Sequence, residues 1–238
     1  MDALAFLALG RRRGRVAVPL AVATLAAAGW AGMVRIGASM EGHAGHSQGV
    51  AALFTMWAAM SVAMMVPIEA PSLVRVARGR SPLLDAAAFL AGYLLPWMAF
   101  SLGAAALQQR LHAAGWIDAS MATSSRGLAA ALLVAAGLAQ LSPFRQACLA
   151  RCRAASLTGT GTGGFVGGLR GSASSIACCG LLMLLPFAIG AMNLAWMAAL
   201  TVLLVVEREV PRASRLGTAA GLLLLALAAA VFGGATLS

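Results

Sequence analysis

Sulfur-bearing side chains recur in this sequence at the spacing of a helical turn. Met56, Met60 and Met64 lie four residues apart. On a helix, successive members of this series are rotated by about 40°, so all three share one face. A thioether is a soft, neutral donor that suits Cu(I) and adds no net negative charge when it is buried. The alternative is that these methionines only fill gaps in helix packing.

Four cysteines supply further soft ligands. Cys178 and Cys179 precede Met183 by about one helical turn, and two thiols with a thioether form a set that can bind a soft metal. Cys148 and Cys152 form a Cys-x3-Cys pair among arginines, whose positive charge favours the thiolate that binds metal. Either pair could instead consist of ordinary core residues, because free cysteine packs as a small hydrophobe.

A pair of histidines adds borderline ligands upstream of these positions. His43 and His46 form a His-x2-His pattern close to Met40 in a glycine-rich segment. This pattern is compatible with the capture of copper or zinc. It also fits a plain glycine-rich loop whose histidines have no role.

One acidic residue lies inside an apolar run. Glu69 is placed between Pro67 and Pro71, where proline removes backbone hydrogen bonds and we expect the helix to bend or break. An ionisable group in a membrane span is costly and indicates a function, here proton or ion coupling. The alternative is a simple ion pair with Arg75 or Arg78 at the end of the span.

The composition indicates that a membrane protein positions these groups. Of the 238 residues, 61% are hydrophobic and 10% are charged, against about 25% charged in a soluble domain. The net charge of +10 comes from arginines clustered between long apolar runs, which is typical of a membrane protein and not of a nucleic-acid groove. The sequence has no phosphate-binding loop, no HExxH and no nucleophile elbow, so we do not expect an enzyme.

Seven apolar stretches approach or reach the length of about 17–25 residues that crosses a bilayer core. We therefore predict an all-α fold, a polytopic transmembrane helical bundle in which residues 1–238 form a single integral membrane domain. The predicted spans are Val16–Val34, Val50–Val74, Leu83–Leu107, Gly127–Leu141, Ser172–Gly190, Met192–Val206 and Leu216–Phe232.

The arginine distribution predicts the orientation. Fourteen arginines fall on the side of the N-terminus and three in the other connections, so the N-terminus should be cytoplasmic and the C-terminus periplasmic in a bacterial inner membrane. A cleaved signal peptide is disfavoured, because no small-x-small cleavage site follows the first apolar run. Cys148 and Cys152 then lie on the cytoplasmic side, where we expect reduced thiols and no disulfide.

Small residues recur every fourth position on the way into the fifth predicted span. On a helix they form a narrow ridge that lets another backbone approach closely. Glycine also weakens helices, so a loop or re-entrant turn over residues 163–172 remains an equal alternative. The ridge consists of Gly163, Gly167, Gly171, Ser175 and Cys179.

Several strings of residues are shared with a known family. They are Met56-Trp57-Ala58-Ala59-Met60, Ala63-Met64-Met65-Val66-Pro67 with Pro71, Cys148-Leu149-x2-Cys152-Arg153, Cys178-Cys179-x3-Met183, Gly190-x-Met192-Asn193-Leu194-x-Trp196-Met197 and Glu207-Arg208. On these strings the chain resembles a bacterial domain-of-unknown-function family described as predicted metal-binding integral membrane proteins. The resemblance implies metal binding without a defined reaction. The Met-x3-Met spacing is also similar to the selectivity motif of high-affinity copper transporters, in local chemistry only.

Our leading hypothesis is a membrane protein that binds a soft metal, Cu(I) first and zinc second. It would move the metal across the inner membrane or deliver it to a membrane metalloenzyme. The expected roles are capture by His43 and His46, a path along Met56, Met60 and Met64, a central site at Cys178, Cys179 and Met183, and cytoplasmic exchange at Cys148 and Cys152.

Two rival hypotheses need no metal. The chain could be a structural or assembly subunit of a larger membrane complex, in which the small-residue ridge and the methionines serve packing alone. It could instead be a proton-coupled carrier of a small solute that uses Glu69.

Overall fold

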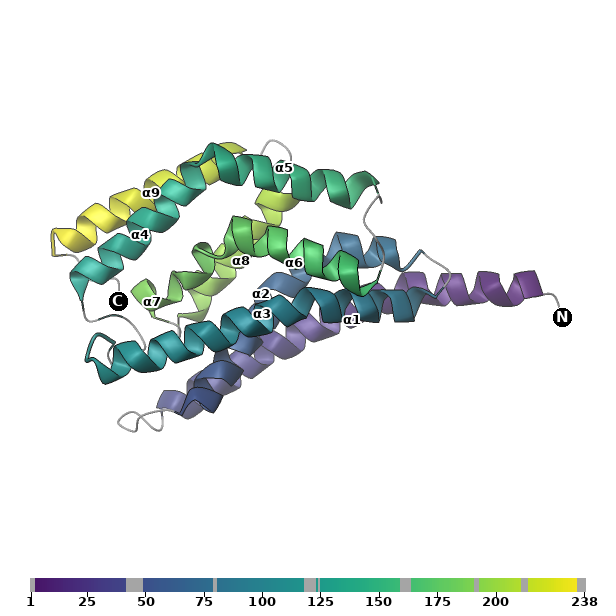
Figure 1. The fold of residues 1–238 in the computed structure, drawn as a ribbon, viewed down its shortest axis with the longest axis horizontal. Helices are drawn as coiled ribbons and strands as arrows, with labels where there is room; N and C mark the ends of the chain where they lie inside the picture. Colours follow the sequence, from purple (N-terminus) through teal and green to yellow (C-terminus); the bar gives the residue numbers. More distant parts are fainter. Residues whose placement is uncertain are drawn as a thin grey trace.

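The computed structural model describes residues 3–41, 49–78, 81–117, 123, 125–158, 164–190, 193–210 and 214–234, and these are almost entirely helical (Figure 1). A single antiparallel bridge joins Ile117 to Thr123. The elements are α1 (Ala3–Glu41), α2 (Val50–Val76), α3 (Pro82–Ala113), α4 (Arg126–Leu141), α5 (Pro143–Thr158), α6 (Phe165–Cys179), the 3-10 turn η1 (Leu182–Leu184), α7 (Pro186–Ile189), α8 (Leu194–Glu209) and α9 (Ser214–Phe232).

The helices form two groups joined through α8. In the first group, α2 packs against α1 and α3, and α6 lies along α3. In the second group, α4 and α9 pair along their lengths (Figure 1). Helix α8 contacts α2 in the first group and α9 in the second, and α5 contacts both α6 and α8. The region around α8 is therefore where residues far apart in the sequence meet.

Within the described residues, four helices are long and apolar enough to cross a membrane. They are α2, α3, the Val16–Ala38 part of α1 and the Arg215–Phe232 part of α9. The number rises to six if each of two bent pairs, α4 with α5 and α6 with η1–α7, counts as one span. Helix α8 has 16 residues, fewer than the about 20 that a span needs. The predicted all-helical class is confirmed, whereas the count of seven and the orientation stay predictions.

The fifth predicted span is not one continuous helix. Helix α6 ends at Cys179, and the segment Leu182–Ile189, which comprises η1 and α7, continues at an angle of 69° to it. The expectation of an unbroken helix over Ser172–Gly190 was therefore wrong. The bonds from Leu184 N to Leu181 O and from Leu185 N to Leu182 O are of the 3-10 type, so the chain leaves the α-helical pattern before it reaches Pro186. Upstream, the glycine-rich segment is helical from Phe165 onward, and Gly163 lies outside the described residues.

The second predicted span, in contrast, is not interrupted. Helix α2 runs without a break from Val50 to Val76, through Pro67 and Pro71. Of the two expected outcomes at Glu69, a bend or a break, the break was therefore wrong, and the bend stays a prediction. Proline is tolerated within membrane helices where neighbouring helices support the backbone, and α1 and α3 both pack on α2.

Glycines bring α6 into backbone contact with α3. A Cβ atom at Gly168 would overlap the carbonyl oxygen of Phe89, and one at Gly92 would overlap the carbonyl oxygen of Phe165. A close backbone approach does occur here, but it uses Gly168 and not a member of the predicted ridge; at the ridge residue Gly171 an added Cβ would meet only side-chain atoms at 3.7–3.8 Å. This contact fixes the position of the helix that carries Cys178.

Substitution of Gly168 by Ala should destabilise the protein by about 1–3 kcal/mol, because the added methyl group forces the two backbones apart. Thermal unfolding in detergent micelles measures the effect. Gly103→Ala on α3 is the matched control, since no atom lies within 4 Å of its added Cβ. Equal unfolding temperatures for the two variants would contradict the backbone contact.

Candidate metal centre

Three of the four cysteines meet where α5 lies against α6. Cys148 and Cys152 come from α5, Cys178 comes from α6, and the three sulfur atoms all lie within 4.8 Å of one another. We call these residues the thiol triad. Cys148 and Cys178 form a disulfide with Cα atoms 6.1 Å apart, and Cys152 is a free thiol. Three sulfurs this close can bind one soft metal ion once all three are reduced.

The disulfide corrects two expectations from the sequence. All four thiols were expected to be reduced, and Cys148 was expected in a site separate from Cys178. The two residues are 30 positions apart, and only the packing of α5 on α6 brings them together. The Cys148–Cys152 spacing does place both residues on one face of α5, as predicted. Cys152 and Cys178 are buried, whereas Cys148 is only half-buried.

A buried carboxylate holds α5 in this position. Glu207 of α8 accepts from Arg145 at 2.6 Å and from the Gln140 side-chain amide at 2.5 Å, so each of its oxygens has a partner. Arg145 also donates through Nε to the carbonyl oxygen of Cys178 at 3.0 Å. One guanidinium group therefore ties α5 to α8 and to the last turn of α6, directly beside the thiol triad.

A second buried ion pair lies between α2 and α8. A carboxylate oxygen of Glu69 is 2.6 Å from Arg208 Nη2, and both side chains are less than a tenth exposed. Glu69 thus forms an ion pair, as the alternative prediction proposed. Its partner, however, is Arg208 and not Arg75 or Arg78. Sequence proximity suggested the wrong arginines because α8 reaches α2 only in the folded chain. A role for Glu69 in proton coupling stays a prediction.

Two ion pairs and a further arginine lie near the thiol triad. Glu207 pairs with Arg145 and Glu69 pairs with Arg208, while the half-buried Arg153 donates to the backbone carbonyl oxygen of Glu207 at 2.8 Å. Buried charge is costly unless it is compensated, and each of the two buried carboxylates has an arginine partner here.

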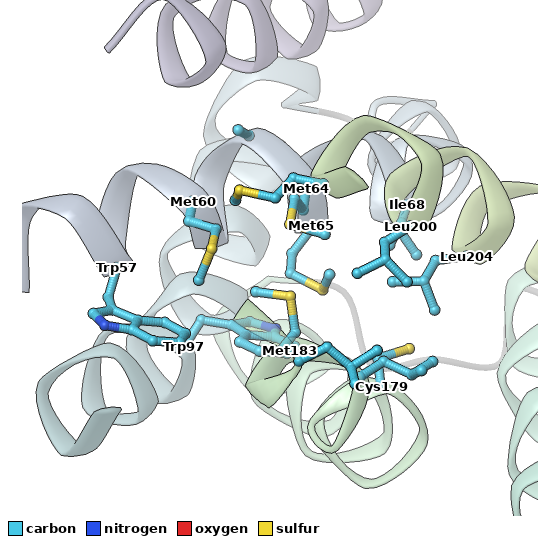
Figure 2. Close-up of a cluster of buried hydrophobic side chains, with 14 of the residues drawn as sticks. Trp57, Met60, Met64, Met65, Ile68, Trp97, Cys179, Met183, Leu200 and Leu204 are labelled. Carbon is cyan, nitrogen blue, oxygen red and sulfur yellow. The ribbon is translucent and has the colours of Figure 1, made fainter. Parts of the chain in front are cut away.

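The methionines of α2 face the protein interior. Met56, Met60 and Met64 are at most 2% exposed. Figure 2 shows Met60, Met64 and Met65 in one buried cluster with Met183 and Trp97, and with Cys179 at its edge. The bend after Cys179 separates this residue from Met183 within the chain, yet both remain buried. Whether these thioethers bind a metal stays a prediction.

The structure says less about the other candidate ligands. His43 and His46 lie outside the described residues. His112 is exposed near the end of α3. Cys179 is buried and free, and it does not belong to the thiol triad.

Sequence reasoning missed the polar residues that hold the site together: Gln140, Arg145, Glu207 and Arg208. Glu207 and Arg208 gave a signal, because an acidic–basic pair at the end of an apolar run needs buried partners. Their partners on α2, α4 and α5 could not be inferred from spacing.

Glu207→Gln should destabilise the protein by about 3–5 kcal/mol, because it leaves the Arg145 guanidinium buried beside a neutral group. Thermal unfolding in detergent micelles gives the measurement. Glu209→Gln, an exposed change two residues away on α8, should stay within about 0.5 kcal/mol of wild type. A Glu207 variant as stable as the Glu209 variant would refute the anchoring role.

Comparison with known proteins places this site in a family. No curated protein and no solved structure matches the chain. A family model for PpoB2, described as a copper chaperone, matches residues 54–231, about three quarters of the chain. The match includes the thiol triad and both buried ion pairs, and it supports the metal-related part of the resemblance seen in the sequence. The chain belongs to the PpoB2 copper chaperone family.

Proposed function

We propose that this protein binds Cu(I) at the thiol triad and delivers it to a copper enzyme at the bacterial inner membrane. The observation that carries the proposal is the convergence of Cys148, Cys152 and Cys178 within 4.8 Å in a helical membrane-type fold. Thiolate is a soft donor that suits Cu(I), and it suits zinc as well. The family description favours delivery over transport across the bilayer.

Copper fits this group better than zinc does. A structural zinc site takes four ligands in a tetrahedral arrangement. Among the described residues, the group offers three sulfurs and no further histidine, cysteine or carboxylate ligand. Zinc therefore remains the second choice.

The buried methionines provide a route for Cu(I) through the apolar interior. Met56, Met60 and Met64 are neutral, so a copper ion passing among them meets no fixed negative charge. Met183 extends this cluster from α2 to the segment that follows α6 (Figure 2). In this proposal His43 and His46 capture copper on the outer side, and the thiol triad is the last site in this protein that binds the ion before delivery.

The two metal-free hypotheses have less support. A purely structural subunit gives no reason for three cysteines to converge within 4.8 Å of one another. The carrier hypothesis depends on Glu69, and this residue lies in a buried ion pair with Arg208. We therefore assign Glu69 a role in anchoring α8 on α2.

Replacing any residue of the thiol triad by serine should weaken Cu(I) binding by at least about tenfold. Loss of a residue that merely supports a metal ligand already lowers affinity by about 10–100-fold, and loss of the ligand itself should cost no less. Competition with bicinchoninate on reduced protein in lipid nanodiscs measures the affinity. Cys179→Ser is the matched control, because this buried thiol adjoins Cys178 but lies outside the triad. Equal affinity in the Cys178 and Cys179 variants would count against the triad.

The methionine route predicts an effect on rate without an effect on affinity. Met60→Leu combined with Met64→Leu keeps the volume and apolar character of both buried side chains. Copper should load from outside several-fold more slowly in proteoliposomes, while bicinchoninate competition gives the wild-type affinity. Met98→Leu on α3, outside the α2 series, should change neither quantity. Wild-type loading by the double variant would exclude the route.

A further inference from the structure

The thiol triad holds a disulfide where copper binding needs thiolates. We propose that the Cys148–Cys178 disulfide is a redox gate on the copper site, and that a dithiol protein of the thioredoxin type opens it by attacking Cys148. The inference rests on the proposed function, since it regulates the same site. It adds a partner of defined chemistry and a state in which the site cannot hold copper.

Metal and disulfide are mutually exclusive at this site because they use the same sulfurs. In the disulfide state, two of the three sulfurs are bonded to each other and have no thiolate to donate. Cys152 is then the one free thiol of the triad. With the disulfide formed, the three sulfurs already lie within 4.8 Å of one another, so reduction supplies three thiol ligands from positions that are close together. The redox state of the disulfide therefore changes the number of sulfur ligands that copper can use, and the arrangement of the helices stays the same.

Burial decides which sulfur an attacking thiolate can reach. Cys178 is 5% exposed and lies at the end of α6, under α5. Cys148 is half-buried, and α5 also carries exposed residues such as Arg151. Exchange requires access to the sulfur under attack. Cys148 is therefore the point of entry and Cys178 the leaving group.

Cys178 leaves from a fixed position. Arg145 donates to the backbone carbonyl oxygen of this residue at 3.0 Å, so the last turn of α6 is held in place while the disulfide bond breaks. Cys152, within reach of both disulfide sulfurs, completes the ligand set after reduction.

The exchange balances in two steps. A thiolate of the partner attacks Cys148 Sγ, the Cys148–Cys178 bond breaks, and Cys178 leaves as a thiolate. The second thiol of the partner attacks the mixed disulfide, which frees Cys148 and oxidises the partner to its own disulfide. The chain gains two electrons and the partner loses two, while copper stays Cu(I). The reverse exchange with an oxidised partner closes the gate and expels the ion.

The predicted orientation agrees with this chemistry. It places the arginine-rich segment that contains α5 in the cytoplasm, where dithiol proteins keep thiols reduced. Disulfides in that compartment are typically transient and serve catalysis or redox sensing. A permanent structural bond would not be expected there, whereas a gate would.

The first test uses the full-length wild-type chain in nanodiscs, so that no variant has to fold. One sample is oxidised until peptide mapping shows the Cys148–Cys178 bond, and the other is reduced with thioredoxin and its reductase. Cu(I) is then added under bicinchoninate competition. The reduced protein should bind stoichiometric Cu(I) and the oxidised protein none. Equal binding by both forms would overturn the gate alone, whereas no binding by either would overturn the proposed function and the gate with it.

The second test identifies the sulfur under attack. A thioredoxin whose resolving cysteine is replaced by serine stops at the mixed disulfide and stays attached to its target. Mass spectrometry of the trapped complex should map the attachment to Cys148, in wild type and in the Cys179→Ser control alike. Attachment at Cys178, or no complex from a protein whose disulfide is intact, would contradict the proposed entry point.

Discussion

The structure depends on the neutralisation of Arg145 by Glu207 inside the protein. Helix α5 contributes Leu149 and Cys152 to the apolar core, but it also buries Arg145, whose charge needs a partner inside a membrane-type bundle. The Glu207 carboxylate accepts from Arg145 and Gln140, and Arg145 in turn holds the carbonyl of Cys178. Breaking such a buried pair leaves an uncompensated charge, which the surrounding helices cannot solvate.

The chemistry of the site follows from this anchor. Once α5 is fixed against α6, its two cysteines face Cys178 and the three sulfurs become a single ligand group. The disulfide and the metal compete for two of these sulfurs, so redox state and copper occupancy are linked by shared atoms and need no change of fold.

The sequence predicted the parts of the structure that depend on local pattern. Hydropathy predicted an all-helical class with long apolar helices, and the Met-x3-Met spacing predicted the side on which Met56, Met60 and Met64 are buried. Local pattern could not predict pairings across the fold. Cys148 meets Cys178, and Glu69 meets Arg208 instead of the nearby Arg75, because α5 and α8 dock on distant helices. The glycine ridge was assigned to the wrong residues, since the contact of α6 with α3 uses Gly168. The break after Cys179 was also missed, because the 3-10 turn that follows it leaves the hydropathy of the segment unchanged.

The central claim is that a copper ion is held by sulfur from two different helices. X-ray absorption spectroscopy of the reduced, Cu(I)-loaded protein tests it most directly, because the spectrum reports the atoms bonded to copper. Our account predicts a first shell of two or three sulfurs that loses sulfur in Cys178→Ser and is unchanged in Cys179→Ser. A shell dominated by nitrogen or oxygen, or one indifferent to Cys178, would contradict it.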